Sequence, residues 1–279
     1  GFSRPFCIET FPNWSYIRTN PEQIMPFQKI EAERLSQSVV SQIETLILRG
    51  ILKPGERLPA ERDLSDRMGV SRPSLREAIA DLQARGLLVS RQGAGVYVGD
   101  VLGSAFSPAL VGLFGSHEEA VFDYLAFRRD MEGLAAERAA QFGTESDLQV
   151  IAAILAKMEA AHLKRDPSDE ADLDASFHMA IIEASHNVVM LHMMRSMYDL
   201  LRQGVFYNRQ VMFQARDIRD SLLAQHRAIN AAVQARDGTG ARLAVAAHMG
   251  FVKRAMQDQI KARRNEDIAR RRLEQERQR

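Results

Sequence analysis

Residues 61–98 read ERDLSDRMGVSRPSLREAIADLQARGLLVSRQGAGVYV. A short helix-forming run in this stretch ends at Gly69, and a second run begins at Ser71, a residue type favoured at helix N-caps, with Ser74 as the competing N-cap. The second run carries apolar residues at helical spacing, which predicts one buried stripe: Leu75, Ile79, Leu82 and Leu87. A short helix, a tight turn and a second helix are typical of a helix-turn-helix.

The flanking residues extend this motif into a winged domain. Upstream, residues 35–52 predict a first helix that stops at Gly50, with apolar residues at helical spacing: Leu35, Val39, Ile43, Leu46 and Ile47. Downstream, the short apolar runs 87–89 and 96–98 flank the glycine-rich stretch 91–95, a pattern typical of a β-hairpin. We therefore expect a winged helix-turn-helix domain over residues 30–100, preceded by an N-terminal extension over residues 1–29.

The cations of this domain suit DNA recognition. Arg72 and Arg76 lie one turn apart at the start of the second helix, where guanidinium groups can reach phosphates and guanine edges. Arg62 opens the preceding helix, and Arg91, Gln92 and Gly93 lie on the wing. Alternatively, the arginines form a solvated helix face paired with nearby acidic residues: Glu61, Asp63 and Glu77. The complete winged pattern favours DNA binding over that alternative.

Composition limits the class of protein. The chain has 279 residues, of which 46% are hydrophobic, enough to fill a core in each of two domains. Its net charge is only +1, so any nucleic-acid binding must come from a local basic face. The single cysteine, Cys7, cannot form an intramolecular disulfide, and no apolar run is long enough to span a membrane. We expect a cytoplasmic protein without a membrane partner.

The second half predicts an all-α helical bundle. Beyond Gly103 the pattern changes to long amphipathic stretches separated by turn residues. The expected helices cover residues 117–141, 145–163, 169–184, 188–208, 218–235 and 240–262. We assign residues 101–116 to a linker, 117–262 to the bundle and 263–279 to a charged tail that forms a solvated or frayed helix. The fold class is therefore mainly α, with a small β-wing.

Four residues of the bundle carry the chemistry of a divalent metal site. Asp174 and His178 lie four apart, so both project from one helix face, and His226 and His248 lie in the middle of later helices. One carboxylate and three imidazoles suit zinc, and also nickel, manganese or iron. Alternatively, each histidine is a hydrogen-bonded core residue, and spacing alone favours this simpler interpretation.

The predicted N-terminal domain, residues 30–100, strongly resembles the winged helix-turn-helix of the GntR superfamily. The resemblance lies in residues 58–64 (LPAERDL), 70–79 (VSRPSLREAI), 86–88 (GLL) and 91–98 (RQGAGVYV). It implies operator contacts at the positions that contact DNA in relatives: Arg62, Ser71, Arg72, Ser74, Arg76, Gln92 and Gly93. Pro73 replaces a residue that is a polar DNA contact in some members, which puts that contact in doubt here.

The bundle resembles the FCD domain, the effector-binding domain of the FadR subfamily. The resemblance lies in residues 174–178 (DASFH), the turn 183–187 (EASHN), His226 with the following RAI, and His248. It implies that Asp174, His178, His226 and His248 bind a metal ion, with zinc expected first. It also implies that Arg128 faces the effector cavity as a carboxylate clamp, although an intrahelical pair with Glu132 is the alternative.

From residue 31 onward the chain most resembles the lactate-responsive and pyruvate-responsive regulators of this subfamily. The resemblance implies an effector that is a small 2-hydroxy or 2-oxo carboxylate such as lactate, pyruvate or glycolate. We predict a homodimeric ligand-responsive regulator, expected to be a repressor, that binds palindromic double-stranded operator DNA and is not an enzyme. The alternatives are a metalloenzyme acting on a small carboxylate, and a regulator whose metal is purely structural or is itself the signal.

Overall fold

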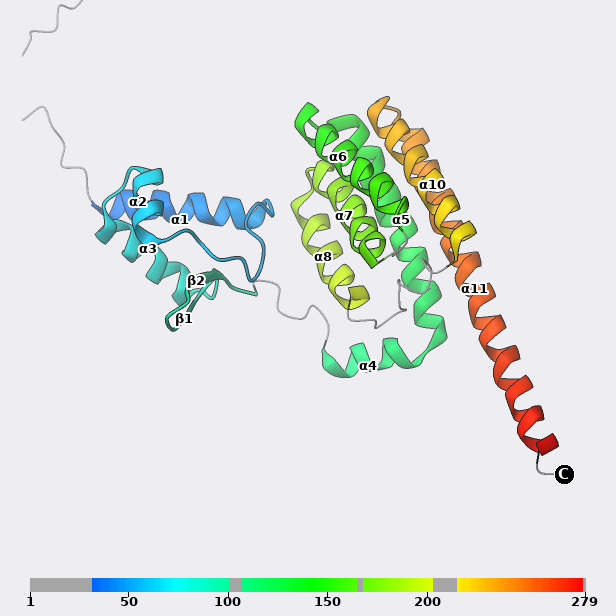
Figure 1. Ribbon diagram of the computed structural model, residues 1–279. Coiled ribbons are helices and arrows are strands. Elements are labelled where there is room, and N and C mark those ends of the chain that lie inside the picture. The colour runs from blue at the N-terminus through cyan, green and yellow to red at the C-terminus, as the bar shows by residue number, and fades with distance from the viewer. Residues whose placement is uncertain (1–31, 101–106, 165–167, 203–214, 278–279) are drawn as a thin grey trace, which may run out of the picture.

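The computed structural model describes residues 32–100, 107–164, 168–202 and 215–277 (Figure 1). The N-terminal extension expected over residues 1–29, including Cys7, lies outside the described residues. Two bodies are visible in Figure 1: a small N-terminal head that carries the only two strands of the described chain, and a larger all-helical bundle. The fold is thus mainly α with a β-wing, as predicted.

The head is built from three helices and one hairpin. Its helices are α1 (Ala32–Leu48), α2 (Glu61–Met68) and α3 (Arg72–Ala84), and its strands are β1 (Leu88–Arg91) and β2 (Gly95–Val98). Helix α3 packs against α1, α2 and β1. Most side chains of the predicted apolar stripes lie in one core, whose most buried members include Val39, Ile43, Leu75 and Leu82, joined by Leu88 of the wing. Leu35, expected in the first stripe, is 42% exposed and lies outside this core.

Local capping explains where the two helices of the helix-turn-helix meet. Helix α2 ends at Gly69, whose φ of 64° is the left-handed conformation that glycine adopts without steric cost. Helix α3 begins after Ser71, whose side chain accepts a hydrogen bond from the backbone N–H of Ser74 at 3.3 Å. Ser71 is thus the N-cap, and Ser74, the competing choice, lies inside the helix.

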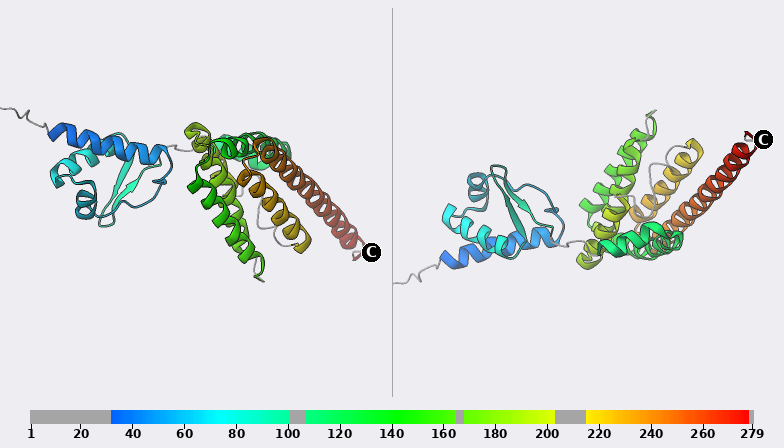
Figure 2. Two further views of the ribbon diagram at one scale, coloured as in Figure 1. Left: turned by 90° about the horizontal axis from the view of Figure 1, so that it is seen from above. Right: turned by 90° about the horizontal axis from the view of Figure 1, so that it is seen from below.

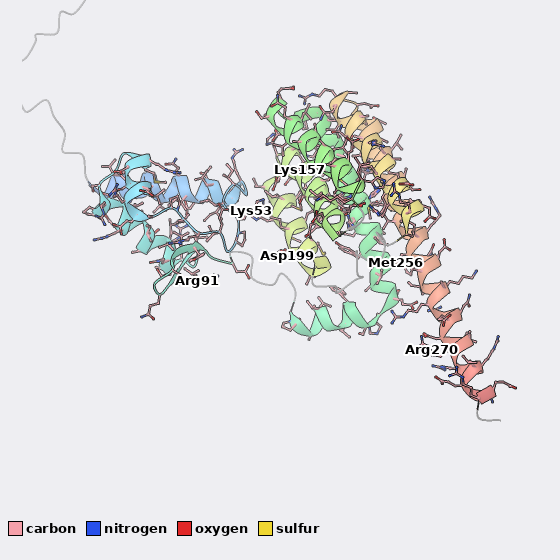
Figure 3. All side chains as sticks on the ribbon, viewed as in Figure 1. Lys53, Arg91, Lys157, Asp199, Met256 and Arg270 are labelled. Carbon is pink, nitrogen blue, oxygen red and sulfur yellow. The ribbon has the colours of Figure 1, made fainter. Side chains whose placement is uncertain are left out.

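The wing is a two-stranded antiparallel hairpin in the register Leu88 with Val98 and Arg91 with Gly95. Its turn closes through a hydrogen bond from the N–H of Ala94 to the carbonyl of Arg91 at 2.9 Å. Gly93 adopts a positive φ of 70°, which explains a glycine at the tip. Figure 3 shows the Arg91 side chain projecting outward from this hairpin.

The bundle contains seven helices among the described residues. They are α4 (Pro108–Ser116), α5 (Glu118–Phe142), α6 (Glu145–His162), α7 (Ser168–Ala184), α8 (Val188–Arg202), α10 (Arg216–Gln234) and α11 (Gly238–Arg277). Central helix α5 packs against α11, α7 and α10. Figure 2 shows α10 between the long helix α11 and the side of the bundle formed by α6 and α7. The bundle core therefore lies where α5, α7, α10 and α11 converge.

Small residues let these helices approach closely. Four alanines of α5 are fully buried: Ala135, Ala136, Ala139 and Ala140. A Cβ atom added at Gly133 would lie 3.3 Å from the side chain of Arg242 on α11, tighter than an ordinary van der Waals contact. This close packing brings polar side chains in the middle of the helices within reach of one another.

The observed helices depart from the expected ones in two places. Residues 101–116, assigned to a linker, include helix α4, which starts at Pro108 after the N-cap Ser107. Residues 203–208 of the helix expected over residues 188–208 lie outside the described residues. Helix α11 continues without a break to Arg277 and extends beyond the bundle into solvent (Figure 1). Its residues 261–277 are exposed, as expected for a solvated tail. None of the described helices meets the length and hydropathy needed to cross a membrane.

Candidate functional site

The four predicted metal ligands converge in the middle of the bundle. Asp174 and His178 come from α7, His226 from α10 and His248 from α11. Each offers one ligand atom to a group whose members all lie within 4.8 Å of one another. All four side chains are buried, with exposed fractions between 0% and 5%. The structure therefore brings together residues that are up to 74 positions apart in the chain, counted from Asp174 to His248.

The spacing of the donor atoms fits a divalent cation. His226 Nε2 lies 3.0 Å from Asp174 Oδ1 and 3.3 Å from His178 Nε2, and His178 Nε2 lies 3.8 Å from Asp174 Oδ1. Ligand atoms about 2.1 Å from a cation are separated by roughly 3.4 Å in a tetrahedron and roughly 3.0 Å between neighbours in an octahedron. Two of these three distances match neighbouring ligands of one ion, and the third, 3.8 Å, requires only a small shift of the side chains.

Hydrogen bonds outside the group orient two of the imidazoles. His178 Nδ1 lies 2.8 Å from Glu132 Oε2, and His248 Nδ1 lies 2.9 Å from Gln225 Oε1. Both acceptors are oxygens, so each Nδ1 donates and each Nε2 is left with its lone pair for the centre. Phe177 packs edge-on against His178 and His226, with ring centroids 5.9 and 5.2 Å away.

The sequence did not identify Glu132 or Gln225 as parts of this centre. Glu132 was considered only as a partner of Arg128, and Gln225 was not singled out. Only their neighbours in the sequence point weakly to a role in the site: Glu132 lies one turn after Arg128, and Gln225 immediately precedes His226. Neither spacing reveals which histidine the oxygen contacts, since that depends on how α5, α7, α10 and α11 pack.

Arg128 forms the intrahelical pair that was the alternative to an effector clamp. Its Nε donates to Glu132 Oε1 at 2.6 Å, and its NH2 group donates to the hydroxyl of Tyr198 at 2.8 Å. The Tyr198 hydroxyl lies 2.8 Å from Glu132 Oε1, and Arg128 and Glu132 are both 2% exposed. Guanidinium, carboxylate and phenol thus form one buried network that joins α5 to α8.

Electrostatics keeps this network charged. Burial by itself raises the pKa of Glu132, but the charge of Arg128, assisted by His178 and by hydrogen bonds from both, holds the pKa well below its usual range. Burial also raises the pKa of Tyr198 well above its usual value. Glu132 is therefore an anion and Tyr198 a neutral phenol at pH 7.

The space beside His226 is small. Met158, Glu170 and Arg219 line a cavity there together with Leu222, Leu223 and His226, and its volume is about 10 Å³. This is about the room that one water molecule needs. A guest with several heavy atoms therefore fits this cavity only if the surrounding side chains repack.

The face of the head that was predicted to bind DNA is largely exposed. Six of the seven predicted residues lie on the surface: Arg62, Ser71, Arg72, Arg76, Gln92 and Gly93. Ser74 differs, because it is 5% exposed and its hydroxyl lies 2.9 Å from that of Ser71. Ser74 thus helps to close the start of α3, and its side chain is not presented on the surface.

Glu61 holds the two arginines of the recognition helix. Its Oε1 lies 3.1 Å from Arg72 Nε and 2.8 Å from Arg76 Nε. The hydrogen bond from Arg76, assisted by Arg72, lowers the pKa of Glu61. The ion pairs considered as the alternative to DNA binding therefore exist at Glu61. They leave both guanidinium groups on the surface, where the side chains are more than half exposed.

The wing carries a further cation, Arg91, as predicted from the sequence. The guanidinium of Arg91 lies 4.3 Å from the centre of the Tyr97 ring, within cation–π distance. The hairpin thus presents a supported positive charge next to the exposed glycine tip at Gly93.

A winged helix-turn-helix head joined to an all-α bundle with buried ligand-type residues defines a ligand-responsive regulator of transcription. The chain belongs to the GntR family of bacterial regulatory proteins, in its FadR-type branch with an FCD domain. Residues 35–98 match the model of the gntR family of bacterial regulatory proteins, and residues 123–251 match the FCD domain. The family that the sequence motifs predicted is thus confirmed.

Several relatives align over most of the chain. A protein described as a "Putative L-lactate dehydrogenase operon regulatory protein" of Escherichia coli K12 is 37% identical over 227 residues, covering 80% of this chain and 86% of its own. The Glc operon transcriptional activator of the same strain is 33% identical, covering 82% of this chain and 92% of its own. The transcriptional regulator LutR of Bacillus subtilis strain 168 is 31% identical, covering 75% and 94%. All three are named as regulators of operons or of transcription, and none is named as an enzyme, in agreement with the family to which the chain belongs.

Proposed function

We propose that the chain is a cytoplasmic, homodimeric repressor whose FCD domain binds a divalent metal ion and a small 2-hydroxy or 2-oxo carboxylate that changes operator affinity. The observation that carries the proposal is the convergence of one carboxylate and three imidazoles inside the bundle: Asp174, His178, His226 and His248. Three buried imidazoles and a buried carboxylate within 4.8 Å are costly to assemble without a shared partner. A cation is the partner that satisfies them together.

Zinc is the metal we expect, with nickel, manganese or iron as alternatives, because imidazole and carboxylate donors suit all four. A bound ion would supply two positive charges and coordination positions for the oxygens of a ligand. Glu132 and Gln225 would hold the imidazoles of His178 and His248 in the orientation that the ion requires.

The charges around the centre favour a monoanionic effector. Asp174 and Glu132 contribute two negative charges and Arg128 one positive charge, so the residues alone sum to −1, that is −1 −1 +1. A divalent ion changes this sum to +1, which one carboxylate neutralises. We propose Arg128 as the cation that faces the carboxylate. The relatives named for an L-lactate dehydrogenase operon and for a Glc operon support a small carboxylate of the lactate, pyruvate or glycolate type.

The head would read the operator through α3 and the wing. We propose DNA contacts at Arg62, Ser71, Arg72, Ser74, Arg76, Gln92 and Gly93, with Ser74 acting through the Ser71 cap because its own hydroxyl is buried. A homodimer fits this role, because two identical heads match the two half-sites of a palindrome.

The test combines elemental analysis with operator binding. Protein purified without added metal is analysed for bound metal, and operator binding is followed by gel shift during titration with L-lactate, pyruvate or glycolate. We expect about one divalent ion per chain and a change in operator affinity of roughly 5- to 150-fold with one of these acids. An unchanged affinity with all three acids at millimolar concentration removes this effector class.

A second candidate is a regulator whose metal is structural. The water-sized cavity beside His226 favours it, because that cavity of about 10 Å³ has no room for a lactate-sized guest. The two candidates differ in the effect of a chelator at fixed carboxylate concentration. A structural metal affects stability and leaves the carboxylate response absent under all conditions, whereas a metal that binds the effector makes the response depend on the ion.

A further inference from the structure

Glu132 contacts both the arginine proposed to face the effector and one proposed metal ligand. Its Oε1 accepts hydrogen bonds from Arg128 Nε at 2.6 Å and from the Tyr198 hydroxyl at 2.8 Å. Its Oε2 lies 2.8 Å from His178 Nδ1. One carboxylate therefore receives donors from α5, α7 and α8 at a position that is 2% exposed.

The carboxylate fixes which nitrogen of His178 faces the centre. An ionised carboxylate only accepts hydrogen bonds, so the proton of a neutral His178 ring lies on Nδ1. The Nε2 lone pair then points into the group where His226 Nε2 lies 3.3 Å away. Without the acceptor, the ring could carry its proton on either nitrogen or rotate, and each change removes a donor from the group.

The position of the carboxylate is itself fixed. Arg128 neutralises its charge, and Arg128 Nε and the Tyr198 hydroxyl both contact Oε1. Oε2 faces His178 Nδ1 at 2.8 Å and has only a longer contact of 3.5 Å with the NH2 group of Arg128. A buried carboxylate is tolerated only when its charge and its lone pairs are satisfied in this way. The arginine and the tyrosine thus act on the histidine through Glu132.

We infer that Glu132 is a positioning residue of the metal centre: its carboxylate, held by Arg128 and Tyr198, presents His178 Nε2 to the ion. This inference rests on the proposed metal site and deepens it. Two hydrogen bonds, Arg128 to Glu132 and His178 to Glu132, then connect Arg128 to a ligand of the ion. The carboxylate of an effector bound at Arg128 and the ion bound at His178 therefore change each other's affinity by the same factor.

The test is Co²⁺ binding by the full chain after removal of metal, followed by visible absorption and by competition with a chelating dye. Glu132→Gln keeps the size of the side chain and removes its charge. Because Arg128 Nε and the Tyr198 hydroxyl both donate to this side chain, the amide oxygen of the variant faces them and its NH2 group faces His178 Nδ1, which then has no acceptor. We therefore expect 10- to 100-fold weaker Co²⁺ binding and a changed Co²⁺ absorption spectrum. The matched control is Glu137→Gln on the same helix, where the carboxylate pairs with Arg242 at 3.0 Å away from the centre. It should bind Co²⁺ like the parent.

A second variant covers the case in which Glu132→Gln does not fold because Arg128 is left buried without a counter-charge. The double variant Arg128→Met with Glu132→Leu removes both charges and also the acceptor that His178 Nδ1 contacts, and it should show the same loss of Co²⁺ affinity. Parent-like Co²⁺ affinity and an unchanged spectrum in whichever of the two variants folds would overturn the inference.

The variant Asp174→Asn distinguishes a failure of the positioning role of Glu132 from a failure of the proposed metal site. If Asp174→Asn loses Co²⁺ binding while the Glu132 variants keep it, the metal site stands and the positioning role of Glu132 is wrong. If Asp174→Asn also binds Co²⁺ like the parent, the proposed centre itself is wrong and the inference falls with it.

Discussion

The guanidinium of Arg195 reaches from helix α8 of the bundle to the carbonyl oxygen of Gly50 in the head, at 3.0 Å. The same NH2 group donates to Glu183 Oε1 on α7 at 2.8 Å. One turn earlier on α8, His192 Nε2 lies 2.8 Å from the carbonyl of Leu48, the last residue of α1. Two side chains of the bundle therefore cap the C-terminal end of a head helix, where positive charge is favoured.

Gly50 is suited to this contact. It has a φ of 74°, and a Cβ at this position would collide with the Arg195 guanidinium. Helix α7, which carries Asp174 and His178, also carries near its C-terminal end the Glu183 that pairs with Arg195. The proposed metal centre is thus joined to the head by one helix, one ion pair and the hydrogen bond from Arg195 to Gly50. Figure 1 shows the end of α1 directed toward the bundle at this point.

We predict that Arg195→Gln uncouples the head from the bundle. The substitution removes the ion pair with Glu183 and weakens the bond to Gly50, so the response of operator affinity to the carboxylate should fall from roughly 5- to 150-fold toward none. Metal content should be unchanged. Fluorescence anisotropy of labelled operator, with and without the acid, measures the effect.

The control for this prediction is Arg227→Gln, which breaks an exposed pair with Glu159 at 2.7 Å between two bundle helices. It should respond to the acid like the parent. A full carboxylate response in Arg195→Gln would show that the signal does not pass through this contact.

On the head, we predict that Arg76→Ala weakens operator binding by roughly 5- to 150-fold, the range of one bidentate arginine–guanine contact. Its guanidinium is exposed near the start of α3 and is held by Glu61. Arg85→Ala serves as the control, because Arg85 follows the end of the same helix and pairs with Glu44 and Asp81. Equal losses in the two variants, measured by gel shift at one salt concentration, would indicate a general charge effect and contradict a specific role for Arg76.

The sequence predicted the head because its signals are local, whereas the metal ligands were predicted through the resemblance to the FCD domain, since spacing alone favoured hydrogen-bonded core histidines. The Ser71 cap, the Gly69 stop and the spacing of Asp174 and His178 each depend on residues within one or two helical turns. The network at Glu132 and the contact of Arg195 with Gly50 could not be predicted, because each joins segments whose meeting depends on tertiary packing. Arg195 and Gly50 are 145 positions apart, and no periodic pattern encodes their distance.

Helix ends were predicted less well where signals compete. Pro108 after Ser107 is a good helix start, yet the glycines at positions 112 and 115 obscured α4 within the expected linker. Beyond residue 262 the apolar stripe stops, which predicted a solvated or a frayed helix; no proline or glycine interrupts the chain, and the solvated helix continues to Arg277.

We also predict an acid-sensitive cap at the start of α6. Asp147 Oδ2 accepts hydrogen bonds from the N–H of Thr144 at 2.7 Å and from its hydroxyl at 2.6 Å, completing a capping box. Burial raises the pKa of Asp147, but the bonds from Thr144, assisted by His186, outweigh it and lower the pKa below 3.8. Because the pKa of Asp147 is lower in the folded state, the stabilisation by its ionised carboxylate is fully present above the pKa of the unfolded state. It is lost as the pH falls through the pKa of the folded state.

Asp147→Ala should therefore lower the free energy of unfolding by about 1 kcal/mol at pH 7. The difference from the parent should shrink below about pH 4, where the unfolded carboxyl begins to take up a proton. Urea unfolding at several pH values measures both. Asp169→Ala removes an exposed pair with Lys164 and should cost much less at any pH. A loss in Asp147→Ala that is constant down to pH 3 would contradict the assigned role of the ionised carboxylate.

Phe177 offers a test of packing beside the centre that is independent of metal. Its ring is fully buried in α7 and lies edge-on to His178 and His226. Phe177→Ala leaves a cavity between α7 and α10 and should lower the free energy of unfolding of the metal-free chain by about 3–5 kcal/mol. Phe142→Ala is the matched control, because Phe142 is exposed at the end of α5 and contacts only the guanidinium of Arg138 among the aromatic and cation–π contacts of the described residues. It should cost less than about 1 kcal/mol. Urea unfolding with chelator present measures both, and equal losses would mean that Phe177 does not pack the imidazoles in place.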